Sequence, residues 1–198
     1  HPDFKDRKDI KYVKRFQETR LSAADFQTMK DEAQRLGFLT ACTPFDEVSV
    51  DLIEQQGFDI LKIASCSFTD WPLLERAART KLPIVASTAG VPTEDIDRVV
   101  AFLQHRDKAL CLMHCVGAYP TPDKELEINQ IDFFRDRYAD TAIGFSTHEE
   151  PDNVNSIKIA VAKGASVFER HVGVPTAAAP NNPYSSSPAQ LRAWRAAA

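Results

Sequence analysis

The sequence lacks the features that mark several broad classes of protein. No stretch approaches the roughly 18 consecutive apolar residues of a membrane-spanning helix, and the N-terminal segment has no apolar core of a signal peptide. No basic run could follow a phosphate backbone, and the formal net charge is −4. We therefore expect neither a membrane protein nor a nucleic-acid-binding protein.

Glycine-rich loops and paired cysteines are absent as well. Neither GxGxxG nor GxxxxGK[ST] follows any apolar run, so a dinucleotide site or a P-loop has no support. The four cysteines form no CxxC pair, and Cys111, His114 and Cys115 have no second ligand pair at the spacing of a structural zinc site. The preferred interpretation is reduced, partly buried thiols in a cytoplasmic protein.

Six short apolar runs recur along the chain, each followed or preceded by a helical pattern. The runs are apolar on both faces, as parallel strands buried on both sides are. The helical segments begin at residues such as Ser22 and Thr93 and end at glycines such as Gly37, Gly57 and Gly164. The runs begin near residues 37, 59, 82, 109, 141 and 166. This pattern predicts a repeated βα unit.

Two α/β architectures fit such a repeat, a doubly wound open sheet and a (β/α)8 TIM barrel. We favour the barrel because polar side chains follow nearly every strand, and a barrel gathers all these strand ends at one mouth. A barrel of eight strands and about 250 residues is typical, so about six βα units make an incomplete one. We expect residues 1–21 to be a charged loop leading into the barrel, and residues 22–198 to be the barrel segment.

Several motifs resemble the N-acetylneuraminate (sialic acid) synthase family. They are TPFDEVSVDLI, LKIAS, IVASTAG, HCVGAYPTP, GFSTH and VFERHV, in that order between Gly37 and Val174. The resemblance implies a (β/α)8 barrel of which this chain holds strands three to eight. It also implies a condensation of phosphoenolpyruvate with an N-acyl amino sugar, with release of phosphate and use of Mn²⁺ or Mg²⁺. An incomplete sheet leaves open edges, so we expect a homo-oligomer.

His148 and His171 end two neighbouring strands of the predicted barrel. Residues i and i+2 of a strand face the same way, so Ser146 lies beside His148, and Glu169 lies beside His171. The resemblance implies that both histidines bind the metal. Two imidazoles leave several positions of an octahedral ion open, which suits polarisation of a sugar aldehyde. The alternative is two unrelated surface or core histidines.

Lys62 lies inside an otherwise apolar strand, where an ammonium group needs an anion or a shifted pKa. The resemblance implies a clamp for the phosphate or carboxylate of phosphoenolpyruvate. A Schiff-base lysine of a class I pyruvate aldolase and a structural ion pair with a barrel carboxylate are the alternatives. For Glu169, three roles stay open: orienting a neighbour, carrying a proton or contacting substrate.

Small polar groups complete the predicted site. The resemblance implies that Ser65, Ser87 and Ser146 hold phosphoenolpyruvate, that Thr43 contacts a ligand and that Tyr119 lines the sugar pocket. Packing of Tyr119 on its own PTP turn is the alternative. We expect Phe45 to be a packing residue and favour a core role for His114, which lies inside a buried strand.

The sequence departs from the family pattern at three places. Gly117 replaces a sugar-pocket asparagine, Thr147 replaces an aspartate, and Asn181 or Asn182 lies where the family has an acid. All three lie on the sugar side or around the metal, so an altered acceptor and a partial loss of activity both fit. A catalytically incomplete barrel that acts as a binding or interaction module is the competing hypothesis.

Overall fold

The computed structural model describes residues 7–177 and 179–198, and the chain divides into two compact units, residues 1–40 and 41–198. The first unit contains helices α1 (Lys11–Glu18) and α2 (Ala23–Arg35). A capping box between Ser22 and Asp25 begins α2, as the sequence predicts. The prediction that residues 1–21 form a loop is wrong for α1. Its charged residues carry an i,i+4 pair, Lys14–Glu18, of a kind that stabilises helices.

The second unit is built on one parallel sheet whose spatial order is the order of the sequence. Its strands are β1 (Ala41–Cys42), β2 (Ile60–Ile63), β3 (Ile84–Ser87), β4 (Leu110–Cys115), β5 (Ala142–Thr147) and β6 (Val167–Arg170). Each strand lies within one of the six predicted apolar runs. Within the described residues, β1 and β6 each pair with one strand only, so the sheet is an open, curled half-barrel.

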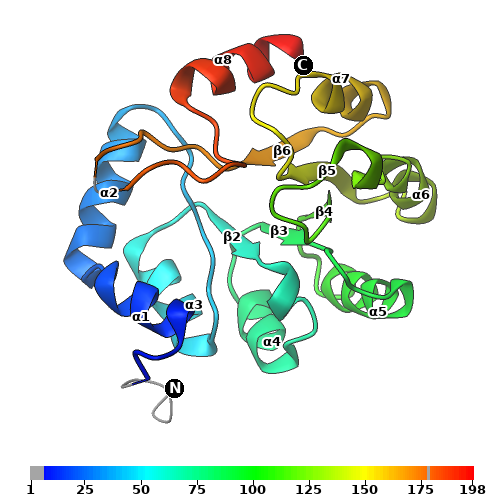
Figure 1. Cartoon of the computed structure of the whole chain (residues 1–198). Coiled ribbons are helices and arrows are strands. Elements are labelled where there is room, and N and C mark those ends of the chain that lie inside the picture. Colours follow the sequence, from blue (N-terminus) through cyan, green and yellow to red (C-terminus); the bar gives the residue numbers. More distant parts are fainter. Residues whose placement is uncertain (1–6, 178) are drawn as a thin grey trace. The chain divides into compact units, whose positions relative to one another are not determined.

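Helices follow each strand and surround the sheet of this unit (Figure 1). They are α3 (Glu47–Gln56), α4 (Trp71–Arg79), α5 (Thr93–Gln104), α6 (Gln130–Arg137), α7 (Asn155–Ala162) and α8 (Pro188–Ala197), with short 3₁₀ turns at Ser65–Ser67 and Asp123–Glu125. Asp46, Asp70 and Ser187 accept hydrogen bonds from the first turns of their helices. No helix of the described residues is long and apolar enough to span a membrane.

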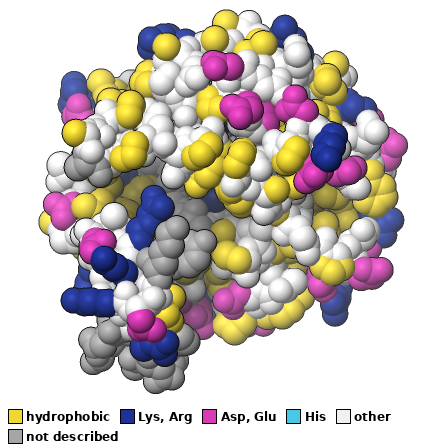
Figure 2. Space-filling model, in the orientation of Figure 1, with side chains coloured by type: hydrophobic (Ala, Val, Ile, Leu, Met, Phe, Trp, Pro, Cys, Tyr) yellow, Lys and Arg dark blue, Asp and Glu magenta, His cyan; other side chains and the backbone are white. Residues whose placement is uncertain are grey.

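The core lies between the sheet and these helices. Alternate strand residues and one face of each helix are buried there, among them Leu61, Ile63, Leu73, Ile84, Leu103, Leu112, Phe145 and Ile157. Burying a side chain of this size contributes roughly 1.5–3 kcal/mol, which makes this layer the main source of stability. Acidic and basic side chains are interspersed over the face drawn in Figure 2.

β5 passes very close to both neighbouring strands at Gly144. A Cβ atom at this position would lie 2.6 Å from the carbonyl oxygen of Val167 in β6 and would collide with the side chain of Met113 in β4. Backbone of a paired strand cannot move aside, so glycine is required here.

Candidate functional site

A cavity of about 390 Å³ opens at the carboxyl ends of the strands in the second unit. All nine residues that the sequence singles out line it: Thr43, Lys62, Ser65, Ser87, Tyr119, Ser146, His148, Glu169 and His171. Phe45, which we expected to be a packing residue, also lines the cavity and is exposed. The structure brings the predicted residues to one place, whereas their chemical roles stay predictions.

Lys62 forms the charged centre of this cavity. Its Nζ donates to Ser87 Oγ at 2.5 Å and to Glu169 Oε2 at 2.8 Å, which joins β2 to β6 across the concave side of the sheet. An ion pair with a barrel carboxylate, one of the three alternatives for this lysine, is therefore present. The Lys62 side chain is 13% exposed and that of Glu169 is 45% exposed, so the pair remains accessible from the cavity.

The charge of Glu169 is set by opposing effects. Burial alone would raise the pKa of this carboxyl group. The charge and hydrogen bond of Lys62, with smaller effects of Ser146 and His148, outweigh burial and lower the pKa below its usual value. Glu169 is therefore a carboxylate at neutral pH.

His148 and His171 lie side by side at the cavity mouth, with ring centroids 5.3 Å apart. Ser146 pairs with Glu169 in the β5–β6 ladder, so the residues two positions further on also meet. Burial and the neighbouring His171 lower the pKa of His148 to about 4, and burial lowers the pKa of His171. Both rings are therefore neutral at pH 7, the state in which imidazole binds a metal.

The two histidines are the donor set available for a divalent ion. His148 Nδ1 lies 3.3 Å from the carbonyl oxygen of Val116, an arrangement that leaves Nε2 free to bind. No group of three or more His, Cys, Asp or Glu side chains in the described part of the chain could hold an ion. Two neutral imidazoles fit an ion whose remaining positions are taken by water and substrate.

Aromatic rings border the histidines. The Tyr119 ring lies 3.9 Å from that of His148, centroid to centroid, and is itself half exposed. Tyr184, which the sequence interpretation missed, lies 5.1 Å from the His171 ring and 5.3 Å from the Tyr119 ring. Only the replaced loop around Asn181 and Asn182 pointed to this segment, and no pattern distinguished the tyrosine within it.

The serines and His114 lie as their local sequence suggests. Ser87 and Ser146 are buried at the carboxyl ends of their strands, and Ser65 Oγ accepts from the Ala89 N–H at 3.0 Å. His114 is a core residue, as favoured, with Nε2 2.8 Å from the Leu126 carbonyl oxygen and its ring stacked on Phe145. Burial lowers its pKa.

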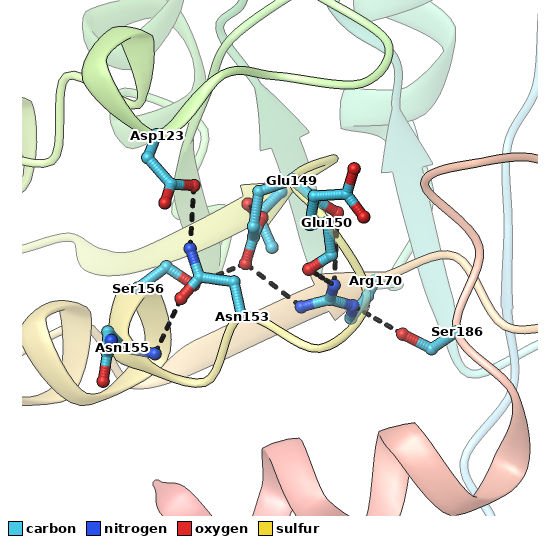
Figure 3. Close-up of polar contacts among 9 residues, drawn as sticks. Asp123, Glu149, Glu150, Asn153, Asn155, Ser156, Arg170 and Ser186 are labelled. Atoms are coloured by element: carbon cyan, nitrogen blue, oxygen red, sulfur yellow. Dashed lines mark hydrogen bonds and ion pairs between the residues drawn. The ribbon is translucent and has the colours of Figure 1, made fainter.

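A buried ion pair beside the cavity also escaped the sequence interpretation. Arg170 Nη1 lies 3.1 Å from Glu149 Oε1, and the two side chains are 1% and 0% exposed (Figure 3). Arg170 precedes His171 and Glu149 follows His148 in the sequence. Charged residues beside both site histidines were a possible sign, but nothing in the sequence shows that they meet.

The sequence model of the NeuB family matches residues 2–197 of the chain. The chain belongs to the NeuB family. This confirms the resemblance that the strand-end motifs carry.

Several relatives of known sequence support the assignment to the NeuB family. An uncharacterised protein of Methanocaldococcus jannaschii is 30% identical over 165 residues, which cover 83% of this chain and 48% of that protein. N-acetylneuraminate-9-phosphate synthase of Drosophila melanogaster is 35% identical over 64% of this chain and 34% of its own length. N,N'-diacetyllegionaminic acid synthase of Campylobacter jejuni is 30% identical over 70% of this chain and 42% of its own length. The chain thus spans half or less of the length of these relatives.

Solved structures agree. A candidate spore coat polysaccharide biosynthesis protein E from Chromobacterium violaceum superposes with a TM-score of 0.96 at 57% identity, covering 100% of this chain and 59% of that one. N-acetylneuraminic acid synthetase from Leptospira borgpetersenii, in complex with citrate, gives a TM-score of 0.83 at 27% identity, covering 90% of this chain and 62% of its own. The fold of this chain is therefore shared with a part of each of these longer proteins.

The three departures from the family pattern differ in their surroundings. The Thr147 hydroxyl is hydrogen-bonded to the Glu149 carboxylate, so a negative charge lies next to this position. Asn181 Nδ2 donates to the Gly173 carbonyl at 3.3 Å, which keeps its amide on its own loop. Gly117 has only Ala89 near the place that a Cβ would occupy, so the change to glycine leaves open space there.

Proposed function

We propose that this NeuB-family chain carries the site for a divalent-metal-dependent condensation of phosphoenolpyruvate with an N-acyl amino sugar. The enol carbon of phosphoenolpyruvate would attack the sugar aldehyde carbon, and water would add to the resulting oxocarbenium carbon. Inorganic phosphate would leave as that tetrahedral intermediate collapses. The product would belong to the nonulosonic acids, the class to which the acids named for several relatives belong.

One observation supports this proposal most directly. A lysine that pairs with a carboxylate, several hydroxyl groups and two neutral imidazoles line a single cavity. An anionic substrate needs the first two kinds of group, and an aldehyde that must be polarised needs a Lewis acid nearby.

The side chains divide between the two substrates on this proposal. Lys62, Ser65 and Ser87 lie together where β2 and β3 end, and they would hold the phosphate and carboxylate oxygens of phosphoenolpyruvate. Tyr119 lies against His148 on the other side and would contact the acceptor sugar. Such positioning lowers the entropic cost of bringing two reactants together.

Thr43 and Ser146 would place further hydroxyl groups along the phosphoenolpyruvate side of the cavity. Glu169 lines the cavity, and as a carboxylate it would accept a proton from the attacking water. His148 and His171 would hold Mn²⁺ or Mg²⁺, which supplies Lewis-acid polarisation of the aldehyde when bound.

The class I aldolase alternative finds less support. A Schiff base needs an unprotonated lysine amine. Lys62 Nζ instead donates to the Glu169 carboxylate at 2.8 Å and to Ser87 Oγ at 2.5 Å, so its nitrogen is held in hydrogen bonds rather than free to attack a carbonyl carbon. Borohydride with pyruvate would trap a Schiff base covalently, and we expect no such adduct.

Calorimetry of the chain with phosphoenolpyruvate and Mn²⁺ tests the proposal. We expect heat of binding for both, and Lys62→Met should abolish the phosphoenolpyruvate heat while Mn²⁺ binding persists. Lys108→Met, which changes a lysine that donates to the Thr80 carbonyl outside the cavity, is the matched control. No heat with either ligand from a folded sample would refute the proposal for this chain.

The open sheet favours a second candidate, a binding or interaction module without turnover. The chain covers about half of its relatives' length, and the two edge strands have one partner each in the described residues. Ligand heat without phosphate release from phosphoenolpyruvate and a panel of N-acyl amino sugars would support it.

The same open edges lead us to propose a homo-oligomer, which analytical ultracentrifugation tests. The four free thiols fit a reducing compartment such as the cytoplasm.

A further inference from the structure

The buried pair Arg170–Glu149 has no part in the chemistry proposed above. Glu149 directly follows His148, just after the end of β5, and Arg170 of β6 directly precedes His171. Successive strand residues point to opposite faces, so these side chains leave the sheet on the side away from the cavity. Contacts confirm this side, because Ser156 of α7 hydrogen-bonds to Glu149 and the Trp194 ring of α8 lies against Arg170.

The polar groups of this pair are satisfied by four different segments. Arg170 Nε donates to Ser186 Oγ at 2.7 Å, and its Nη2 donates to the carbonyl oxygens of Glu149 and Glu150. The Glu149 carboxylate accepts from the hydroxyl groups of Thr147 and Ser156. The end of β5, the start of α7, β6 and the loop before α8 therefore meet at this one ion pair (Figure 3).

The same network fixes the backbone on which His171 lies. Ser186, fully buried, donates its N–H to the His171 carbonyl oxygen at 2.9 Å and accepts from the Gly173 N–H at 2.9 Å. Since Arg170 holds the Ser186 side chain, one residue ties the strand before His171 to the loop beside it.

A buried ion pair such as Arg170–Glu149 provides hydrogen bonds of fixed direction. Removing two charges from water is costly, so a buried ion pair is a poor source of stability compared with apolar packing. Its bonds have fixed directions, however, and the planar guanidinium group can hold several acceptors at once. Here those acceptors lie directly after His148 in the chain and in the loop that hydrogen-bonds to the His171 backbone.

We infer that Arg170 and Glu149 are positioning residues that set the relative placement of His148 and His171. The inference about placement stands on geometry alone, and its consequence for metal binding rests on the proposed function. Glu149 also places a carboxylate beside Thr147, the position at which the family has an aspartate. The Thr147 hydroxyl bonds to the Glu149 carboxylate, which lies two residues further along the chain.

Two measurements on the full chain test this inference. Histidine ring NMR resonances report placement without any metal, because the Tyr119 ring lies 3.9 Å from the His148 ring and shifts its signals. Calorimetry with Mn²⁺ alone reports the donor set. For Glu149→Gln we expect shifted ring resonances of both histidines and Mn²⁺ binding weakened on the order of ten- to a hundredfold, as for other partners of metal ligands.

Asp97→Asn is the matched control. It also converts one carboxylate of an arginine ion pair to an amide, but Arg137–Asp97 lies on the surface between α5 and α6. Its histidine resonances and Mn²⁺ affinity should equal those of the parent.

Moving the carboxylate from position 149 to position 147 separates an effect on the placement of the histidines from an effect on stability. Glu149→Thr should shift the ring resonances, and the double variant Thr147→Asp/Glu149→Thr should return them toward the parent by restoring a carboxylate at position 147. If Glu149→Gln fails to fold, this double variant and Arg170→Lys carry the test. A folded Glu149→Gln chain with parental resonances and parental Mn²⁺ affinity would overturn the inference. A parent that binds no Mn²⁺ would overturn the proposed metal site, while the resonances would still decide the question of placement.

Discussion

Glu169 and Arg170 are adjacent in β6, yet their ion pairs lie in different surroundings. Glu169 faces the cavity, where its pair with Lys62 is 45% and 13% exposed. Arg170 faces the helices, where its pair with Glu149 is 1% and 0% exposed. In an ion pair that is open to a cavity, a ligand can replace the partner that has the same charge. A fully buried ion pair is out of reach of ligands and can only connect segments of its own chain. One strand therefore supplies a binding group and a structural group at consecutive positions.

Breaking the buried pair Arg170–Glu149 should have the largest effect on stability. Arg170→Met leaves the Glu149 carboxylate buried without its countercharge, and removing one partner of such a pair typically costs about 3–5 kcal/mol. Urea unfolding followed by circular dichroism measures this loss in the free energy of unfolding. A loss as small as that of a surface pair would show that water reaches Glu149.

Acidification should have an intermediate effect on stability, through protonation of His148 in the cavity. The pKa of His148 is about 4 in the folded chain, well below the usual value near 6.5. The unfolded chain then binds more protons between these values, so stability is fully present above pH 6.5 and declines as the pH falls toward 4. Between pH 7 and 5 the parent should lose on the order of 1–2 kcal/mol more than His148→Gln. Urea midpoints at the two pH values test this, and equal losses would contradict it.

Breaking the cavity pair should affect stability least. Lys62→Met leaves Glu169 partly in contact with water, which can solvate the carboxylate, so we expect a change of under about 1 kcal/mol. The same urea experiment measures it. A loss equal to that of Arg170→Met would remove the distinction between the two pairs.

Local patterns predicted much of the fold. Each apolar run contains a strand because parallel strands need apolar residues on both faces, and the glycines at Gly37, Gly57 and Gly164 have the positive φ of helix ends. The helix Lys11–Glu18 was missed although its few apolar residues lie on one face, because the segment is short and mostly polar or charged. The two-residue β1 is far shorter than its run, since strand length depends on pairing that a single run does not encode.

The residues that line the cavity were predictable from local patterns, but the hydrogen-bond network of Arg170 and Glu149 was not. Strand alternation places Ser146 with His148 and Glu169 with His171 on one face, and that follows from the sequence alone. The meeting of Arg170 with Glu149 depends on the register between β5 and β6 and on burial by two helices. Tyr184 likewise depends on the path of a loop, which no periodicity fixes.

Gly144 limits how this half-barrel can vary. Its neighbours occupy the space that a side chain would need, and it lies in β5 four residues before His148, which follows the end of that strand. In a saturation library selected for folded chains, position 144 should therefore contain glycine only. Mutations can reshape the loops that border the cavity, but the close spacing of β4, β5 and β6 cannot change at this point without loss of the fold.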